Sequence, residues 1–144
     1  MRAANFRGSN RSGVVDLAGP QALPHTVEAP RLARRYLASM AAAWPAGVLE
    51  VAVLLTSELV TNAVTHGRRP VELRLIDDGN QIKVEISDGD PQPLPGEANR
   101  PPATQQSGRG LLIVDNLADR WGCRLHRAPP GKTVWFELSY QCAD

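Results

Sequence analysis

The fold is decided by residues 56–67, which read Thr56-Ser57-Glu58-Leu59-Val60-Thr61-Asn62-Ala63-Val64-Thr65-His66-Gly67. Apolar residues recur through this stretch at the spacing of a helix, and the glycine at its end is a stop signal. The pattern predicts a helix from about Ala46 to His66. Glu58 and Asn62 are four residues apart, so both project from one face of that otherwise apolar helix.

The pair of Glu58 and Asn62 has two readings. Mg²⁺ prefers oxygen ligands and keeps several waters, so an Asn oxygen together with nucleotide phosphates is enough to hold it. Glu58 would then act as a general base toward a hydroxyl or a water. An ordinary solvated pair at this spacing is common on helices. Taken alone, the two residues favour that simpler reading.

The chain before this helix predicts a tail and two further elements. Residues 1–13 are rich in Arg, Asn, Ser and Gly, so we expect them to be disordered. A short strand over Val14–Leu23 is interrupted by Gly19-Pro20. Glu28-Ala29-Pro30 then opens a helix, because proline is tolerated in a first turn. That helix is expected to end near Trp44-Pro45.

Two stretches of alternating polar and apolar residues after the long helix predict a β-hairpin. The stretches are Val71–Leu75 and Ile82–Ile86, and Asp77-Asp78-Gly79-Asn80 between them is a strong turn signal. The apolar residues of both stretches fall on one face, which we expect to be buried.

The last third of the chain predicts a loop, a helix and two strands. Gly89–Ser107 contains five prolines, and a loop of this length is usually either disordered or functional. Gly110–Trp121 then predicts a third helix, followed by strands Gly122–Arg127 and Thr133–Tyr140 with a Pro-Pro-Gly turn at 129–131. We therefore expect an α+β fold, a two-layer sandwich with a mostly antiparallel sheet and the helices on one face.

Composition narrows the class of protein. A chain of 144 residues, 42% of them hydrophobic, fits one domain, which we place at residues 14–144. The net charge is only +1, from 16 basic and 15 acidic residues, which argues against a nucleic-acid-binding module. The basic start lacks a following apolar segment, and no apolar run approaches the roughly 20 residues that span a bilayer. We therefore expect a soluble, cytoplasmic protein.

Cys123 and Cys142 form no metal-ligand spacing with each other or with the histidines. A disulfide between them is one reading. Two reduced thiols in a cytoplasmic protein is the reading that we favour.

Two further features could contact a nucleotide. Asp88 follows the second hairpin strand, and Gly89 after it permits close approach, so the carboxylate can accept a hydrogen bond from an exocyclic amine. Ser-Asp-Gly-Asp is equally ordinary turn chemistry. Gly108-Arg109-Gly110 closes the long loop at a helix start, where backbone N–H groups and Arg109 favour an anion. No parallel strand–turn–helix unit surrounds these glycines, so they are not a dinucleotide fingerprint.

Taken in order along the chain, these features resemble the Bergerat-fold (GHKL) ATPases, a superfamily that includes gyrase and the histidine kinases. The resemblance covers about residues 24–140. The stretch from Glu58 to Gly67 is especially similar to the small anti-sigma-factor serine/threonine kinases of actinobacteria. So is Gly108-Arg109-Gly110-Leu111 running into Ala118-Asp119-Arg120-Trp121-Gly122.

The resemblance implies an ATP site with Mg²⁺. Glu58 would be the catalytic base, Asn62 would bind Mg²⁺ and phosphate, and Asp88 would bind the adenine amino group. Residues 90–107 would form a mobile ATP lid. The other implied site residues are Gly89 beside the base, Gly108, Arg109, Gly110 and Leu111 around the phosphates, His66 at the helix end, and Thr133 as an adenine-side hydroxyl. His66 and Thr133 also have plain structural readings, as a packing residue and a β-branched strand former.

The chain departs from the family pattern in one place. Many members carry Asp-x-Gly-x-Gly where this chain has Asp88-Gly89-Asp90-Pro91. The first expectation is an anti-sigma factor that phosphorylates Ser or Thr of an anti-anti-sigma (STAS-type) partner, and the intact Glu58 favours it. The alternative is a non-catalytic module that sequesters a sigma factor or another regulator, with nucleotide as a structural ligand or absent. The altered Asp88 box favours this alternative, and a homodimer is compatible with either.

Overall fold

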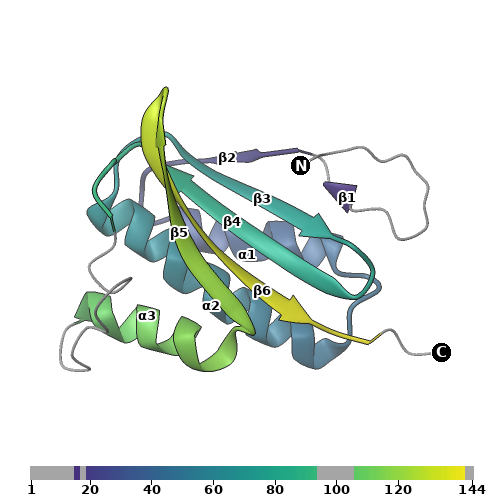
Figure 1. The fold of residues 1–144 in the computed structure, drawn as a ribbon. Coiled ribbons are helices and arrows are strands. Elements are labelled where there is room, and N and C mark those ends of the chain that lie inside the picture. Colours follow the sequence, from purple (N-terminus) through teal and green to yellow (C-terminus); the bar gives the residue numbers. More distant parts are fainter. Residues whose placement is uncertain (1–14, 17–18, 94–105, 142–144) are drawn as a thin grey trace.

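An antiparallel sheet carries the described helices on one of its faces in the structure, a computed structural model that describes residues 15–16, 19–93 and 106–141 (Figure 1). The helices are α1 (Ala29–Met40), α2 (Ala46–His66) and α3 (Gln106–Leu117). The strands are β1 (Val15–Asp16), β2 (Gln21–Leu23), β3 (Val71–Asp77), β4 (Gln81–Asp88), β5 (Arg120–Arg127) and β6 (Pro130–Ser139). This arrangement confirms the predicted α+β two-layer fold. The tail predicted at 1–13 lies outside the described residues.

The strands of the sheet follow the order β1-β3-β4-β6-β5, with β2 also paired to β3, and every pairing among the described residues is antiparallel. The predicted hairpin is β3 and β4. Its turn contains Gly79 at a φ of 91°, a left-handed conformation that glycine adopts without strain. The interrupted strand predicted around Gly19-Pro20 is present as β1 and β2, both short and both on the outer side of β3.

The two faces of the sheet differ because side chains alternate along each strand. The helix-covered face receives Ile86 and Asp88 of β4, and the open face receives Ser87. Asp88 pairs with Lys132 across β4 and β6, which places Lys132 on the helix-covered face as well.

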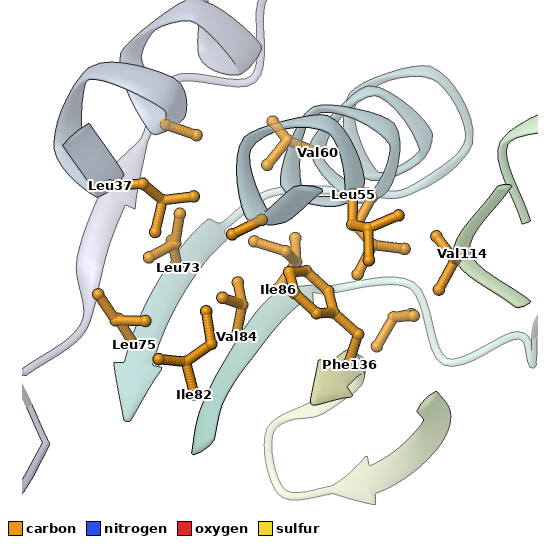
Figure 2. Close-up of a cluster of buried hydrophobic side chains, with 14 of the residues drawn as sticks. Leu37, Leu55, Val60, Leu73, Leu75, Ile82, Val84, Ile86, Val114 and Phe136 are labelled. Atoms are coloured by element: carbon orange, nitrogen blue, oxygen red, sulfur yellow. The ribbon is translucent and has the colours of Figure 1, made fainter. Parts of the chain in front are cut away.

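α2 is the central helix of the helical layer, because it contacts α1, α3, β4 and β6. It has the predicted bounds, and it ends where the Gly67 N–H donates to the Ala63 carbonyl at 3.0 Å. Figure 2 shows Phe136 of β6 pointing toward Ile86 and α2. The largest fully buried apolar side chains of the core are Phe136, Leu37, Leu55, Leu73, Leu75, Ile82, Ile86, Val60, Val71, Val84 and Val114.

α2 corrects the expectation that no apolar run approaches the length that spans a bilayer. By length and composition alone α2 is apolar enough to cross a membrane, with a mean hydropathy of 1.5 over its best window, and no other helix in the described ranges is. In this structure α2 is instead a core helix between the other two helices and the sheet.

α1 ends at Met40, earlier than the predicted end near Trp44-Pro45. Ala41 has left the helical conformation (φ −99°, ψ 25°), and the Trp44 N–H donates to the Ala41 carbonyl across a turn. A residue that precedes proline is disfavoured in a helix, and the Trp44 indole N–H donates to Asp77 Oδ2 of β3 at 2.9 Å. Trp44 therefore packs as a bridge to the sheet.

α3 begins and ends four residues before the predicted range Gly110–Trp121. The Ala118 N–H closes the last helical turn on Val114, whereas the Asp119 N–H donates to the Glu137 carbonyl of β6 at 2.9 Å. This bond draws the chain into β5, so Trp121 is a strand residue. The turn between β5 and β6 lies at Ala128-Pro129, and Pro130 already belongs to β6, which shifts the predicted turn at 129–131.

Candidate functional site

A pocket opens between α2, α3 and the paired ends of β4 and β6. It encloses about 770 Å³ of empty space, including the part that is open to solvent. The walls are mostly apolar with a few polar groups, which is the usual character of a small-molecule site. The described residues that line it are Leu59, Asn62, Ala63, His66, Ile86, Asp88, Asp90, Gln92, Pro93, Leu111, Lys132 and Val134.

α2 brings two of the predicted residues to this pocket. Asn62 is half-buried and lines it, and His66, exposed one turn later, lies at the same wall. Glu58 is half-buried but is not among the lining residues. At 1.5 Å per residue, its backbone lies about 6 Å from that of Asn62 along the helix axis. Glu58 therefore stands just outside the pocket, on the Asn62 side of the helix.

Asp88, at the end of β4, is buried and lines the pocket as predicted. Its Oδ1 accepts three hydrogen bonds: from the Asp90 N–H at 2.7 Å, the Lys132 ammonium at 3.2 Å and the Arg68 N–H at 3.4 Å. Within the described ranges, no group donates to Oδ2. The carboxylate is thus held in one orientation by its own chain and keeps one oxygen for another donor.

Three glycines fit closely around Asp88. A Cβ on Gly67 would lie 2.5 Å from the carboxylate carbon Cγ, and one on Gly131 would lie 2.4 Å from the Asp88 carbonyl oxygen. A Cβ on Gly89 would lie 2.2 Å from the Arg69 carbonyl oxygen. The close approach predicted at Gly89 therefore exists, but it is an approach to the backbone after α2, and Gly89 does not line the pocket.

Lys132 is a pocket residue that the sequence analysis missed. Its side chain is only 6% exposed, and Nζ donates to Asp88 Oδ1 at 3.2 Å and to the Asp90 carbonyl at 3.3 Å. A lysine is rarely this buried unless it is paired. The available signal was its position in β6, because Lys132 shares a strand face with the apolar residues Val134 and Phe136.

Thr133 corrects a prediction. It was expected beside the adenine, but it lies on the open face, where its Oγ1 is 2.7 Å from Ser87 Oγ and 3.0 Å from His126 Nε2. It lines a second, polar hollow on that face together with Glu85 and Arg124. Adjacent residues of a strand face opposite ways, so the residue of this strand end that lines the pocket is Lys132.

Gly108, Arg109 and Gly110 lie inside the first turns of α3, whereas Gly108 and Arg109 were predicted in the loop before a helix that begins at Gly110. An α-helix leaves its first four N–H groups without intrahelical partners, so this end of α3 still offers backbone donors to an anion. The Arg109 side chain lies outside the described part of the chain. Leu111 is buried and lines the pocket.

The range predicted as an ATP lid, 90–107, is only partly described. Asp90, Gln92 and Pro93 line the pocket, and residues 106 and 107 belong to α3. Residues 94–105 lie outside the described ranges, as does Cys142.

The polar and apolar groups of the pocket fit a purine nucleotide with its metal. Asp88 Oδ2 can accept a hydrogen bond from a base amine, and Ile86 and Leu111 supply apolar walls for a planar ring. Asn62 supplies one oxygen of the kind that Mg²⁺ prefers. No cluster of three or more His, Cys, Asp or Glu side chains that could hold a metal occurs in the described ranges. A metal at Asn62 would therefore take its other ligands from phosphate and water.

Comparison with known proteins agrees with this geometry. A search of curated proteins finds no match. The family model of the histidine kinase-like ATPase domain matches residues 23–138, a range that includes every described residue of the pocket. The chain therefore belongs to the histidine kinase-like ATPase family, whose members use ATP.

Proposed function

We propose that this protein is a cytoplasmic anti-sigma factor that transfers the γ-phosphoryl group of ATP to Ser or Thr of an anti-anti-sigma (STAS-type) partner. The observation that supports the proposal most is that Asn62 of α2, Asp88 of β4 and Leu111 of α3 line one pocket although they are distant in sequence. Each comes from one of the motifs on which the resemblance to these kinases rests.

Each residue of the site has one task in this proposal. Asp88 Oδ2 accepts a hydrogen bond from the base amine, Asn62 contributes its amide oxygen to the metal, and the N–H groups at the start of α3 contact phosphate. The metal, when bound, offsets the charge that develops on the transferred group. The phosphorus–oxygen bond to the ADP leaving group breaks, a bond to the partner's hydroxyl oxygen forms, and Glu58 takes the hydroxyl proton.

The place of Glu58 supports its assignment as the base. It lies one turn from Asn62 on the same side of α2, yet it does not line the nucleotide pocket. A base for a second substrate must meet a hydroxyl that arrives from outside the nucleotide site. Glu58 is half-buried, so a docked partner can reach it.

A second candidate function is a non-catalytic module that sequesters a sigma factor or another regulator. One observation favours it: Asp88 has a buried cationic partner of its own chain in Lys132, and a carboxylate already neutralised in this way has less need of a ligand donor. The two functions differ in whether Glu58 is needed.

The test is incubation with labelled ATP, Mg²⁺ and a STAS-domain partner, followed by detection of phosphoprotein. Glu58→Ala should lower transfer by at least about 100-fold, the usual loss for a general base, and should leave ATP binding unchanged. Asn62→Ala should weaken both binding and transfer. The matched control is Glu50→Ala, an exposed glutamate two turns earlier on α2, which should behave as wild type.

The outcomes separate the two candidates. Transfer that persists in Glu58→Ala would remove the base assignment. Wild-type protein that binds ATP and the partner but transfers no phosphate would support the sequestering module instead.

A further inference from the structure

Lys132 is the pocket group to which the proposed function gives no task. Its ammonium is one of two opposite charges on the pocket floor, and the side chains of Lys132 and Asp88 are only 6% and 3% exposed. Both residues line the pocket, so the pair is buried from bulk water but faces the space that a ligand would enter.

Counting donors and acceptors defines what this pair offers. An ammonium has three N–H donors, and two from Lys132 go to Asp88 Oδ1 and the Asp90 carbonyl. Oδ1 of Asp88 is filled by three donors from the chain, whereas Oδ2 receives none from the described residues. Among the described residues, the Asp88–Lys132 pair therefore keeps one open acceptor beside one open donor.

The edge of a purine base carries the complementary arrangement. Adenine has an amino donor at C6 next to the acceptor N1, and guanine has the acceptor O6 next to the donor N1–H. The order of donor and acceptor is opposite in the two bases, so in a given pose only adenine can give a hydrogen bond from C6 to a carboxylate oxygen and receive one at N1 from an ammonium. The hydrogen bond from a charged donor is the stronger kind and contributes about 1.5–3 kcal/mol.

We propose that Lys132 recognises the base of the bound nucleotide through a hydrogen bond. Its third N–H donates to N1 of adenine, while Asp88 Oδ2 accepts a hydrogen bond from the neighbouring amino group at C6. It follows that the pocket prefers adenine to guanine nucleotides, because guanine in the same pose would place its O6 acceptor against Asp88 Oδ2 and its N1–H donor against the ammonium. This inference rests on nucleotide binding in this pocket, as in the proposed function, but not on phosphoryl transfer.

The competing explanation is that the Lys132–Asp88 pair is structural. Removing one partner of a buried ion pair destabilises the site whatever the ligand, so a simple loss of ATP affinity in a Lys132 variant would not decide between the two. The deciding readout is the preference between two ligands that differ only in the atom that Lys132 contacts.

The experiment measures by calorimetry the affinities of ATP, 1-deaza-ATP and GTP without any partner protein. In 1-deaza-ATP a C–H replaces N1, which removes the acceptor alone. Wild type should bind ATP at least about tenfold more tightly than 1-deaza-ATP, from the strength of one charge-assisted bond. GTP should bind at least about tenfold more weakly than ATP, because it loses both hydrogen bonds to the pair. In Lys132→Thr, the preference for ATP over 1-deaza-ATP should disappear.

Lys83→Thr is the matched control, because Lys83 and Lys132 are the two lysines of the chain. Lys83 lies on the open face, 3.7 Å from Glu85 and 4.6 Å from the centre of the Trp135 ring. It should keep the wild-type preference. If Lys132→Thr fails to fold, the wild-type comparison of ATP with 1-deaza-ATP still decides.

Equal wild-type affinities for ATP and 1-deaza-ATP would overturn the inference, and so would a preference that survives in Lys132→Thr. Absence of any nucleotide binding would also overturn it, together with the ATP site. A wild type that shows the base preference but no phosphoryl transfer would leave this inference standing and contradict only the proposed kinase activity.

Discussion

The two faces of the sheet are built from the same strands but have different chemistry. On the helix-covered face, β4 and β6 present apolar side chains such as Ile86 and Phe136 and then, at one end, the charged pair of Asp88 and Lys132. On the open face the same strands present hydroxyl and charged groups, among them Thr133 with its bonds to Ser87 and His126.

This difference teaches that the pocket continues the hydrophobic core. Its walls are core residues such as Leu59 and Ile86, and its polar groups are placed where the helical layer stops covering the sheet. Substitutions on the helix-covered face should therefore change both stability and nucleotide binding. Substitutions on the open face should leave nucleotide binding unchanged.

The largest effect is expected from Phe136→Ala on the helix-covered face. Phe136 is fully buried, and truncation of a buried Phe costs about 3–5 kcal/mol in the free energy of unfolding. Urea unfolding followed by circular dichroism measures the loss. The control is the exposed Ser139→Ala near the end of the same strand, which should change the free energy of unfolding by less than about 0.5 kcal/mol. A loss below about 1 kcal/mol for Phe136→Ala would contradict the assigned core.

Asp88→Asn should come next. The change leaves the Lys132 ammonium buried without its counter-charge, so the free energy of unfolding should fall by about 3 kcal/mol, the lower end for an unpaired buried ion. ATP affinity should fall as well, because an amide in this place accepts a hydrogen bond less strongly than a carboxylate. Thermal melting and calorimetric titration with ATP measure the two effects. Unchanged ATP affinity would end the assignment of Asp88 to the base.

Gly67→Ala tests the close fit between the end of α2 and Asp88 in the pocket. The added Cβ would lie 2.5 Å from Asp88 Cγ, so the carboxylate or the helix end must move, at a cost of about 1–3 kcal/mol typical of overpacking. ATP should bind more weakly because Asp88 is displaced. Gly47→Ala on the same helix is the control. A Cβ there meets no atom within 4 Å, and the higher helix propensity of Ala should raise stability by up to about 1 kcal/mol.

The smallest effect is expected from Thr133→Val on the open face. The shape is kept and the hydroxyl is lost, so its bonds to Ser87 and His126 disappear at a cost of about 1 kcal/mol in stability. ATP affinity should stay at the wild-type value, and titration with ATP tests this. A tenfold weaker ATP affinity would place Thr133 back at the nucleotide, as the family resemblance implied.

The parts of the fold that sequence analysis predicted are those encoded by local periodicity. α2 has the expected bounds because its apolar spacing and Gly67 are both local signals. The β3–β4 hairpin was predicted for the same reason. The bounds of α3 were wrong because the bond from Asp119 to Glu137, which starts β5, joins residues that are distant in the chain.

The residues of the candidate site also divide into those that local patterns predict and those that depend on long-range pairing. The places of Asn62 and Asp88 at the pocket could be predicted, because each is set by the residue pattern of its own helix or strand. Thr133 was expected at the nucleotide and Lys132 was missed, because a shift of one residue in a strand exchanges the two faces of the sheet. Only the register of β6 against β4, which pairs Asp88 with Lys132, fixes that choice.

The fit of Gly67 against Asp88 has a mechanical consequence. Gly67, the first residue after α2, has no side chain and packs directly against the Asp88 carboxylate at the end of β4. A displacement of the Asp88 carboxylate toward Gly67 would therefore press on the end of α2, the helix that carries Asn62 and Glu58. Because α2 is one continuous helix from Ala46 to His66, a shift of its end would also shift Asn62 and Glu58.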